Sequence, residues 1–527
     1  MIARSRTHSG IAQSCESAAR RTATRAVLVI IASLFELIAP NARGADLSSA
    51  VIRGSSVYSA AELFPVYREQ LGKPISVEGA RAIVRALAAK YEADGYSRPQ
   101  VRVDDALIAA GVLRVDVLET RIDEVTISGD PGPHRARLER LGAQLAGSAP
   151  VRQENMQTAL RRMRELPGLT VAASTEAAAD QVNVYRLDID TTFDALTGAV
   201  RLSNRGTEEV GPEFVLGQVV ANGLFRGQTN IGVLFGAALD YDEYSGLGVL
   251  ANVGVGNAGG RIAATGFRSR SDPQEAIVDR DDSYLRDRVS LRYTRPVAGF
   301  ARANLSLFGG LDLDDLTIRR MNVSLRDERL RMLETGASAT WRGGAATQYA
   351  TTLELVKGLN GLGSGLTALD LASDSRSADF TLTRMTFVRL TRLSERWTLR
   401  LDGFAQTSAY VLPYNERFKI GGDRLGRGFE VAEIAGDQGI GAKIEGRRRL
   451  AGVPAALGRT SVYGFYDLGA AWKQDFPGRE SAATGGIGFA TQGRRMSGMI
   501  ELAQPLTHAD VEGSTGLSLF AELSITF

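Results

Sequence analysis

Two short segments of the chain carry residue types and a spacing that could do chemistry. Residues 421–429 read Gly-Gly-Asp-Arg-Leu-Gly-Arg-Gly-Phe, which sets Arg427 between glycines, and residues 465–469 read Phe-Tyr-Asp-Leu-Gly. The second segment alternates like a strand, so Asp467 points away from the apolar face. A carboxylate held away from water needs a partner, and a guanidinium can offer it two parallel hydrogen bonds. These segments therefore predict charge pairing, and no catalytic constellation accompanies them.

The composition excludes several other kinds of site. The chain has 62 basic and 60 acidic residues, a balance that argues against a nucleic-acid partner. Its three histidines, His8, His134 and His508, are too scattered for a zinc site, and Cys15 is the only cysteine. We expect no enzyme activity, no metal and no cofactor.

The N-terminus is typical of an export signal. Arginines precede an apolar run at residues 26–39, and Ala42-Arg43-Gly44 supplies the small residues that a signal peptidase reads. The run is too short and interrupted for a good spanning helix. We therefore predict a signal peptide over residues 1–44, with an uncleaved signal anchor as the alternative.

The next segment predicts two α/β modules, over residues 45–119 and 120–192. Each has the order strand, helix, helix, strand, strand, which makes it a repeat in architecture. In the first module Ser76 caps a helix that presents Ile83, Leu87 and Tyr91 on one face. Taken alone, the modules could be soluble domains of any function.

Residues 193–527 predict a transmembrane β-barrel. Each odd-numbered connection between strands is longer than its neighbours, as alternating external loops and periplasmic turns require. Most of the strands reach or exceed the roughly 9–11 residues that a tilted strand needs to cross a bilayer. An even strand number returns both ends to one side. The sixteen expected strands are 195–204, 212–222, 227–238, 246–255, 260–268, 284–294, 301–312, 328–342, 347–357, 377–391, 395–408, 437–449, 458–471, 482–491, 496–504 and 516–526.

Side chains of these strands alternate between a face for lipid and a face for a wet lumen. The last strand ends at Phe527, a terminal aromatic residue that resembles the recognition signal of outer-membrane barrels. The acidic run at residues 312–315 is expected at a strand end and loop, where solvated charge is the default and calcium binding the alternative. Charges expected to keep the lumen polar are Arg400, Asp402, Lys443, Glu445, Arg447 and Glu501.

The two segments described first resemble the loop and strand motifs of the two-partner secretion transporters, the haemolysin secretion/activation family. Arg427, Gly428 and Phe429 match the family's Arg-Gly-Phe/Tyr loop motif, and Phe465, Asp467 and Gly469 match its Phe-x-Asp-x-Gly strand motif. The resemblance implies that the loop folds back into the barrel, where its arginine meets the aspartate of the wall as a lock. It also implies that each module is a POTRA (polypeptide-transport-associated) domain.

The resemblance further implies an outer-membrane translocator with periplasmic POTRA domains. Its partners would be an unfolded exported protein of the adhesin or haemolysin kind, outer-membrane lipid, and the barrel-assembly machinery acting on the C-terminal strand. Family members often carry an N-terminal helix that plugs the barrel. Here the first module begins almost at the predicted cleavage site, so we expect no plug.

Two other functions share parts of this pattern. An assembly factor that inserts outer-membrane proteins has the same architecture and loop motif, but usually carries more than two modules. A passive porin would explain the barrel and leave the modules and both motifs without a role.

Overall fold

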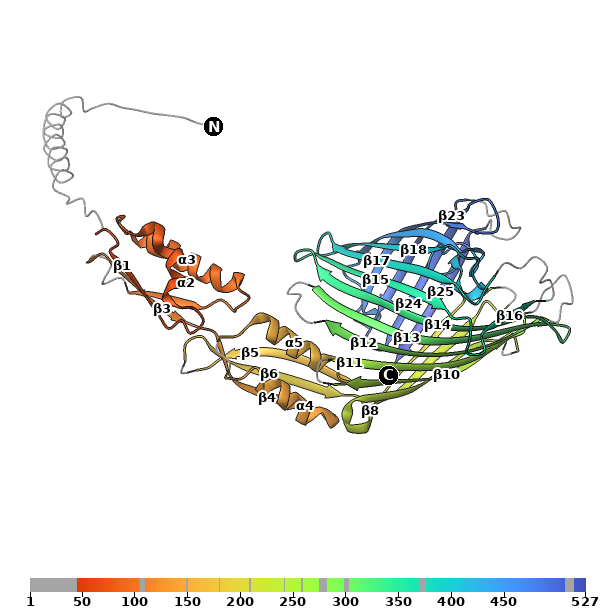
Figure 1. Cartoon of the computed structure of the whole chain (residues 1–527), viewed down its shortest axis with the longest axis horizontal. Coiled ribbons are helices and arrows are strands. Elements are labelled where there is room, and N and C mark those ends of the chain that lie inside the picture. The colour runs from red at the N-terminus through yellow and green to blue at the C-terminus, as the bar shows by residue number, and fades with distance from the viewer. Residues whose placement is uncertain are drawn as a thin grey trace, which may run out of the picture. The chain divides into compact units, whose positions relative to one another are not determined.

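In the computed structural model, two three-stranded sheets with helices precede a closed barrel (Figure 1). The predicted export signal, with Cys15, lies outside the described residues. None of the helices within the described residues combines the length and apolarity that a membrane span needs. The structure describes residues 45–104, 110–147, 150–179, 181–207, 210–240, 242–256, 259–273, 282–297, 303–368, 376–507 and 516–527.

The first module is a three-stranded sheet covered by two helices. Its strands lie in the order β1-β3-β2, with β1 parallel to β3 and β2 antiparallel at the other side. Ser59 and Ser76 cap the two helices, and the core packs around Leu87, Tyr91 and Leu113. Its elements are β1 (Ser49–Arg53), α2 (Ala60–Tyr67), η1 (Arg68–Gln70), α3 (Val77–Ala93), β2 (Gln100–Asp104) and β3 (Val112–Leu118).

The second module repeats this arrangement. Its strands lie in the order β4-β6-β5, so in both modules the last strand in sequence occupies the middle of the sheet. Leu138, Met163 and Leu187 are fully buried and form part of its interior. Its elements are β4 (Arg121–Gly129), η3 (Gly132–His134), α4 (Arg135–Ala143), α5 (Gln153–Arg164), β5 (Leu169–Ala177) and β6 (Val184–Phe193).

Sixteen antiparallel strands close into a barrel, which confirms the predicted fold class. The barrel closes where β25 pairs with β7, with Glu522 opposite Ser203. Every predicted strand overlaps an observed one. They are β7 (Leu196–Ser203), β8 (Phe214–Gly223), β9 (Thr229–Ala238), β10 (Tyr244–Val255), β11 (Gly260–Ser271), β12 (Asp282–Val297), β13 (Ala303–Arg320), β14 (Val323–Arg342), β15 (Thr347–Gly358), β17 (Thr381–Arg392), β18 (Trp397–Ser408), β21 (Gln438–Arg449), β22 (Arg459–Trp472), β23 (Glu480–Gln492), β24 (Met496–Pro505) and β25 (Ser518–Thr526).

The barrel differs from the sequence prediction at one hairpin. β13 and β14 continue to a tight turn at Met321 and Asn322, where a long loop was expected. The short strand β16 (Gly365–Ala368) pairs with the extended part of β14. Asp312 and Asp314 therefore lie within a strand, and the prediction of solvated loop charges is wrong for both.

The two aspartates are buried because strand alternation continues along this hairpin. Asp312 is 2% exposed and Asp314 is 1% exposed. Each contacts an arginine of the neighbouring strand β12: Arg288 at 3.4 Å for Asp312 and Arg286 at 2.5 Å for Asp314. Charge pairing across the strands offsets the cost of removing these carboxylates from water.

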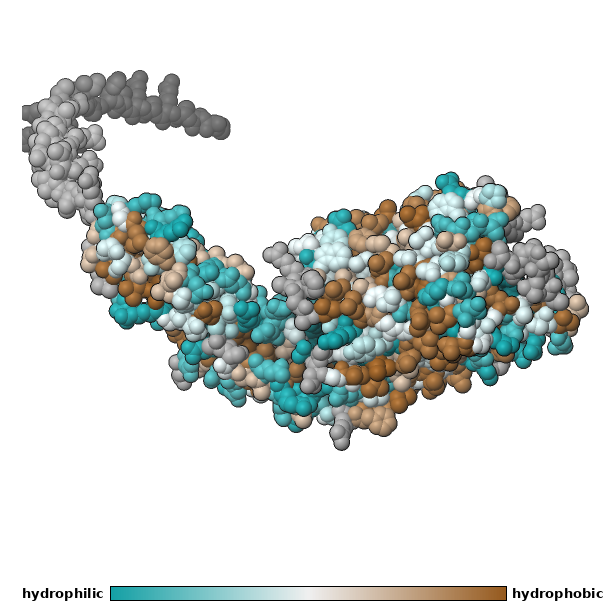
Figure 2. Space-filling view, viewed as in Figure 1, coloured by the Kyte–Doolittle hydropathy of each residue, from teal (hydrophilic) through white to brown (hydrophobic). Residues whose placement is uncertain are grey.

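The outer face of the barrel carries the apolar half of the alternating pattern. Figure 2 shows hydrophobic residues gathered over the barrel on the side in view. On β22 the exposed side chains include Val462, Tyr466 and Leu468, whereas Phe465 and Asp467 are buried. At the closing seam Phe527 exchanges two backbone hydrogen bonds with Gly198. The assembly role of Phe527 stays a prediction.

Candidate functional site

The site is built on the long connection between β18 and β21, residues 409–437, which we call the lock loop. Within it η5 (Tyr414–Glu416) leads into a two-stranded ribbon of β19 (Phe418–Ile420) and β20 (Ile434–Gly436). Residues 421–433 connect these strands and carry Arg427; we call them the tip. The wall opposite the tip consists of β21, β22, β23 and β24.

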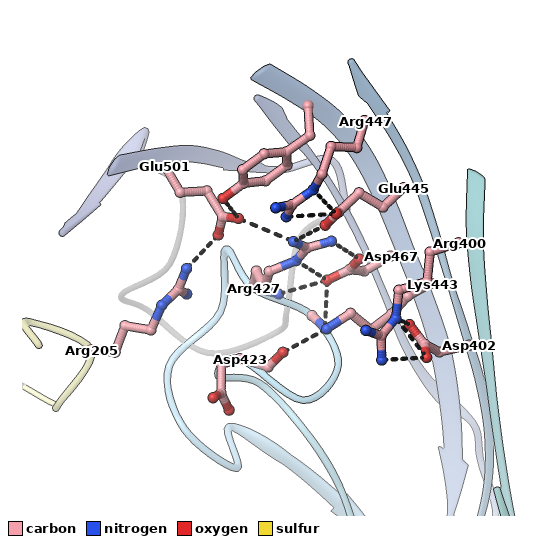
Figure 3. Close-up of polar contacts among 12 residues, drawn as sticks. Arg205, Arg400, Asp402, Asp423, Arg427, Lys443, Glu445, Arg447, Asp467 and Glu501 are labelled. Atoms are coloured by element: carbon pink, nitrogen blue, oxygen red, sulfur yellow. Dashed lines mark hydrogen bonds and ion pairs between the residues drawn. The ribbon is translucent and has the colours of Figure 1, made fainter. Parts of the chain in front are cut away.

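Arg427 and Asp467 form a buried, two-pronged ion pair (Figure 3). The Arg427 Nε donates to Asp467 Oδ2 at 3.0 Å, and its Nη2 donates to Oδ1 at 2.9 Å. The backbone N–H groups of Gly426 and Arg427 also donate to Oδ2, at 3.3 and 3.2 Å. Asp467 is fully buried and Arg427 is 5% exposed. The aspartate therefore receives four hydrogen bonds from the tip, and such charge-assisted bonds are among the stronger ones in proteins.

Two glutamates of the wall complete the surroundings of Arg427. Its Nη1 donates to Glu501 at 3.0 Å and to Glu445 at 3.3 Å. Its guanidinium also stacks over the Phe465 ring, 3.5 Å from the centroid. The aromatic face attracts the cation and shields it from water.

The same glutamates bind further groups of the wall, as Figure 3 shows. Arg205, which follows β7, pairs with Glu501, and Arg447 pairs with Glu445. The Tyr463 hydroxyl donates to Glu501 at 2.9 Å. Three guanidinium groups thus face three carboxylates, so the charges of this cluster balance. Balanced charge is what a buried polar network needs to remain stable.

Glycines of the wall let the tip approach closely. A Cβ on Gly441 would lie 2.3 Å from Leu425 Cδ2, and a Cβ on Gly469 would lie 3.1 Å from the same atom. On the tip, a Cβ on Gly428 would meet Thr484 and Pro505 at about 3 Å. The motif residue Gly428 thus lies close to the backbone of Pro505, whereas Gly469 leaves room for the side chains of Ile420 and Leu425.

Apolar side chains hold the rest of the loop against the wall. Leu425 and Phe429 of the tip are each 2% exposed. They pack with Phe418, Ile420 and Ile434 of the ribbon and with Ala471 and Ala482 of the wall. The lock loop thus combines an apolar cluster with one central charge pair.

The structure brings the predicted loop and strand motifs together. Phe527 lies apart from them, at the seam between β25 and β7. Of the charges assigned to lumen polarity, Glu445 and Glu501 contact Arg427 itself. Arg400 pairs with Asp402, and Lys443 donates to the Asp423 carbonyl oxygen at 2.6 Å.

Sequence reasoning assigned no role to Arg205, Tyr463 or Gly441. A signal for Tyr463 was present, because it alternates with Phe465 and Asp467 on the inner face of β22. Arg205 belongs to the Asn204-Arg205-Gly206 segment at the opening of the barrel, yet its partner Glu501 is remote in sequence. Within the part of the chain that the structure describes, no group of His, Cys, Asp and Glu side chains could hold a metal ion. The arrangement holds the tip against the wall.

Comparisons with known proteins show which family and fold the chain resembles. Residues 314–491 match the family of the haemolysin secretion/activation protein ShlB/FhaC/HecB, and residues 46–120 match the ShlB-type POTRA domain. The solved structure of CdiB from Escherichia coli superposes with a TM-score of 0.74 at 17% identity, covering 93% of this chain and 92% of that one. The structure of CdiB from Acinetobacter baumannii superposes with a TM-score of 0.63 at 13% identity, covering 98% of this chain and 100% of that one. No curated protein sequence matches the chain.

The Leu425 side chain occupies the space that Gly441 leaves free, which we call the wall groove. Filling this groove is expected to loosen the tip. Gly441→Leu places a side chain where Leu425 packs, at a cost of about 1–3 kcal/mol for overpacking. The amides of Gly426 and Arg427 would then exchange hydrogen faster, as mass spectrometry of the tip peptide can measure. Gly446→Leu is the matched control, because a Cβ at Gly446 of the same strand meets no atom within 4 Å. Equal exchange in both variants would show that the groove does not hold the tip.

Proposed function

Because the chain belongs to the haemolysin secretion/activation family, we propose that it is an outer-membrane translocator that secretes an unfolded partner protein through its barrel. That family is a class of secretion proteins and not of enzymes. The observation that carries the proposal is the buried pair of Arg427 and Asp467, because it fixes a loop against the inner wall of a channel. A tip held by one charge cluster and a small apolar cluster can be displaced by a passing chain.

The two modules would receive the partner on the periplasmic side. Each sheet has its second strand at an edge, β2 in the first module and β5 in the second. An extended segment can add to such an edge through main-chain hydrogen bonds, with little demand on its sequence. This mode suits a partner that arrives unfolded.

The barrel would then pass the chain while the tip moves away from Asp467. Removing one member of a buried ion pair costs on the order of 3–5 kcal/mol, which sets the scale of the lock. Folding of the partner outside the cell supplies direction, since the outer membrane has no ATP. Lipid surrounds the apolar outer face, and the barrel-assembly machinery would recognise the strand that ends at Phe527.

An assembly factor for other outer-membrane proteins is the second candidate, favoured by the same loop motif. The neighbouring gene distinguishes the two. A large secreted protein encoded beside this chain supports the translocator, and that protein is then the substrate for the export measurements below.

The charge network predicts that Arg427→Ala has a larger effect on channel leak and on export than Asp467→Ala. In Asp467→Ala, Glu445 and Glu501 still bind Arg427, whereas Arg427→Ala leaves three carboxylates without their shared cation. Ionic leak through the closed channel in planar bilayers is therefore expected to rise more in Arg427→Ala than in Asp467→Ala, and export of the partner to fall in the same order. Arg400→Ala, which removes a wall arginine paired with Asp402, is the control. If Arg427→Ala and Asp467→Ala both leak and export as the wild type does, the contact between Arg427 and Asp467 is not a lock.

Removal of the modules is expected to abolish export while the barrel still assembles. Deletion of residues 46–191 leaves every barrel strand from β7 to β25 in place. Barrel folding can be followed by its heat-dependent mobility on gels, and export by the partner in the medium. Export at the wild-type level by the truncated chain would remove the modules from the mechanism.

A further inference from the structure

The lock loop has a second point of attachment, at its base. Asp437, at the junction of β20 and β21, is fully buried. Its Oδ1 accepts a hydrogen bond from the backbone N–H of Leu412 at 2.7 Å, and its Oδ2 accepts one from the backbone N–H of Gln474 at 2.7 Å. Leu412 belongs to the first residues of the loop, and Gln474 follows β22. One carboxylate therefore joins the beginning of the loop, its end and the neighbouring connection.

Glu416 makes a second attachment between the base of the lock loop and the barrel wall. This residue of η5 is 4% exposed, and its carboxylate accepts from Arg384 Nη2 of β17 at 2.6 Å. The same guanidinium donates through Nε to Gln406 Oε1 of β18 at 3.0 Å. Gln406 in turn donates to the carbonyl oxygens of Glu416 at 2.8 Å and Asp437 at 3.3 Å. We call Arg384, Gln406, Glu416 and Asp437 the base clamp.

The base clamp and the Arg427 network use different residues. The clamp holds to β17, β18 and the connection that follows β22, whereas Arg427 binds carboxylates within β21, β22 and β24. Only the ribbon of β19 and β20 lies between them. Breaking one set of contacts therefore leaves the other set complete.

Pivots are present where the ribbon meets the tip. Gly421 and Gly422 have φ values of +119° and +83°, and Ala432 on the returning side has φ of +61°. Glycine adopts such angles freely and can leave them with little cost, whereas alanine rarely adopts them. Backbone rotation at these positions can swing the tip without pulling on the clamp.

We propose that the base clamp stays closed during transport and that only the tip, residues 421–433, moves when Arg427 leaves Asp467. This inference rests on the proposed function and identifies the tip as the part of the lock loop that moves during transport. Withdrawal of the whole loop would require two buried sets of charge-assisted bonds to break together, whereas release of the tip requires one. Asp437 and Glu416 are thus positioning residues, which keep the tip within reach of Asp467.

Distances between paired spin labels on the purified full barrel test this directly. One label replaces Leu353 on the outer face of β15, and the second replaces either Asp423 in the tip or Tyr414 at the base; all three side chains are exposed. In Arg427→Ala we expect the tip-to-wall distribution to lose its narrow peak and the base-to-wall distribution to keep it. In Asp437→Ala and Glu416→Ala we expect the base-to-wall peak to be lost.

Two outcomes would overturn the proposal. A base-to-wall peak lost in Arg427→Ala would mean that the loop moves as one body, and a base-to-wall peak kept in Asp437→Ala would mean that Asp437 is no clamp. If Asp437→Ala fails to fold, Asp437→Asn replaces it, because asparagine keeps one carbonyl acceptor and loses the charge. Asp475→Ala is the control, since it removes an exposed carboxylate beside Gln474 that is not part of the clamp. No partner protein is present, so the result is independent of whether the export proposal holds.

Discussion

The position of the tip depends on one physical interaction, the pairing of the buried Asp467 carboxylate with Arg427 and with the backbone amides beside it. All four of these hydrogen bonds come from the tip, and the adjacent residues on the inner wall are Phe465 and Gly469 of β22, Lys443 of β21 and Thr484 of β23. A buried carboxylate is stable when it is paired and hydrogen-bonded, so the contact stabilises Asp467 as well as the tip. The barrel thereby holds one of its own loops against its inner wall.

The surrounding residues make that contact geometrically possible. Strand alternation turns Asp467 of β22, Glu445 of β21 and Glu501 of β24 to the inner face of the wall, and glycines at 441 and 469 remove the side chains that would keep the tip away. Apolar packing by Leu425 and Phe429 stabilises the tip on the wall without imposing one orientation, whereas the directional hydrogen bonds of the ion pair fix where the tip sits. In the proposed mechanism the base clamp keeps the tip close to its site, so rebinding is a local event.

Much of this organisation could be predicted from the sequence. Lipid on one side and water on the other impose a period of two, which is why all sixteen strands were found. The hairpin of β13 and β14 was cut short because the acidic run at residues 312–315 was interpreted as solvated loop charge, and of the two turn residues, Met321 and Asn322, only Asn322 is a usual turn type. The pair of Arg427 and Asp467 followed from resemblance to known motifs. Alternation indicates that Tyr463 faces inward, but its partner Glu501 is remote in the sequence. Gly441 and the base clamp could not be predicted, because their roles depend on how the lock loop folds against the wall.

The central claim is that the tip must leave the wall for a chain to pass. Leu425→Cys combined with Gly441→Cys tests it, since Leu425 Cγ, the position that a cysteine sulfur would take, lies 3.2 Å from a Cβ at position 441, within the reach of a disulfide. Each single cysteine variant serves as a control for the substitution itself. We predict that oxidised double-variant cells export no partner and that a reductant restores export in the same cells. Undiminished export from a barrel shown to be fully cross-linked would contradict the account.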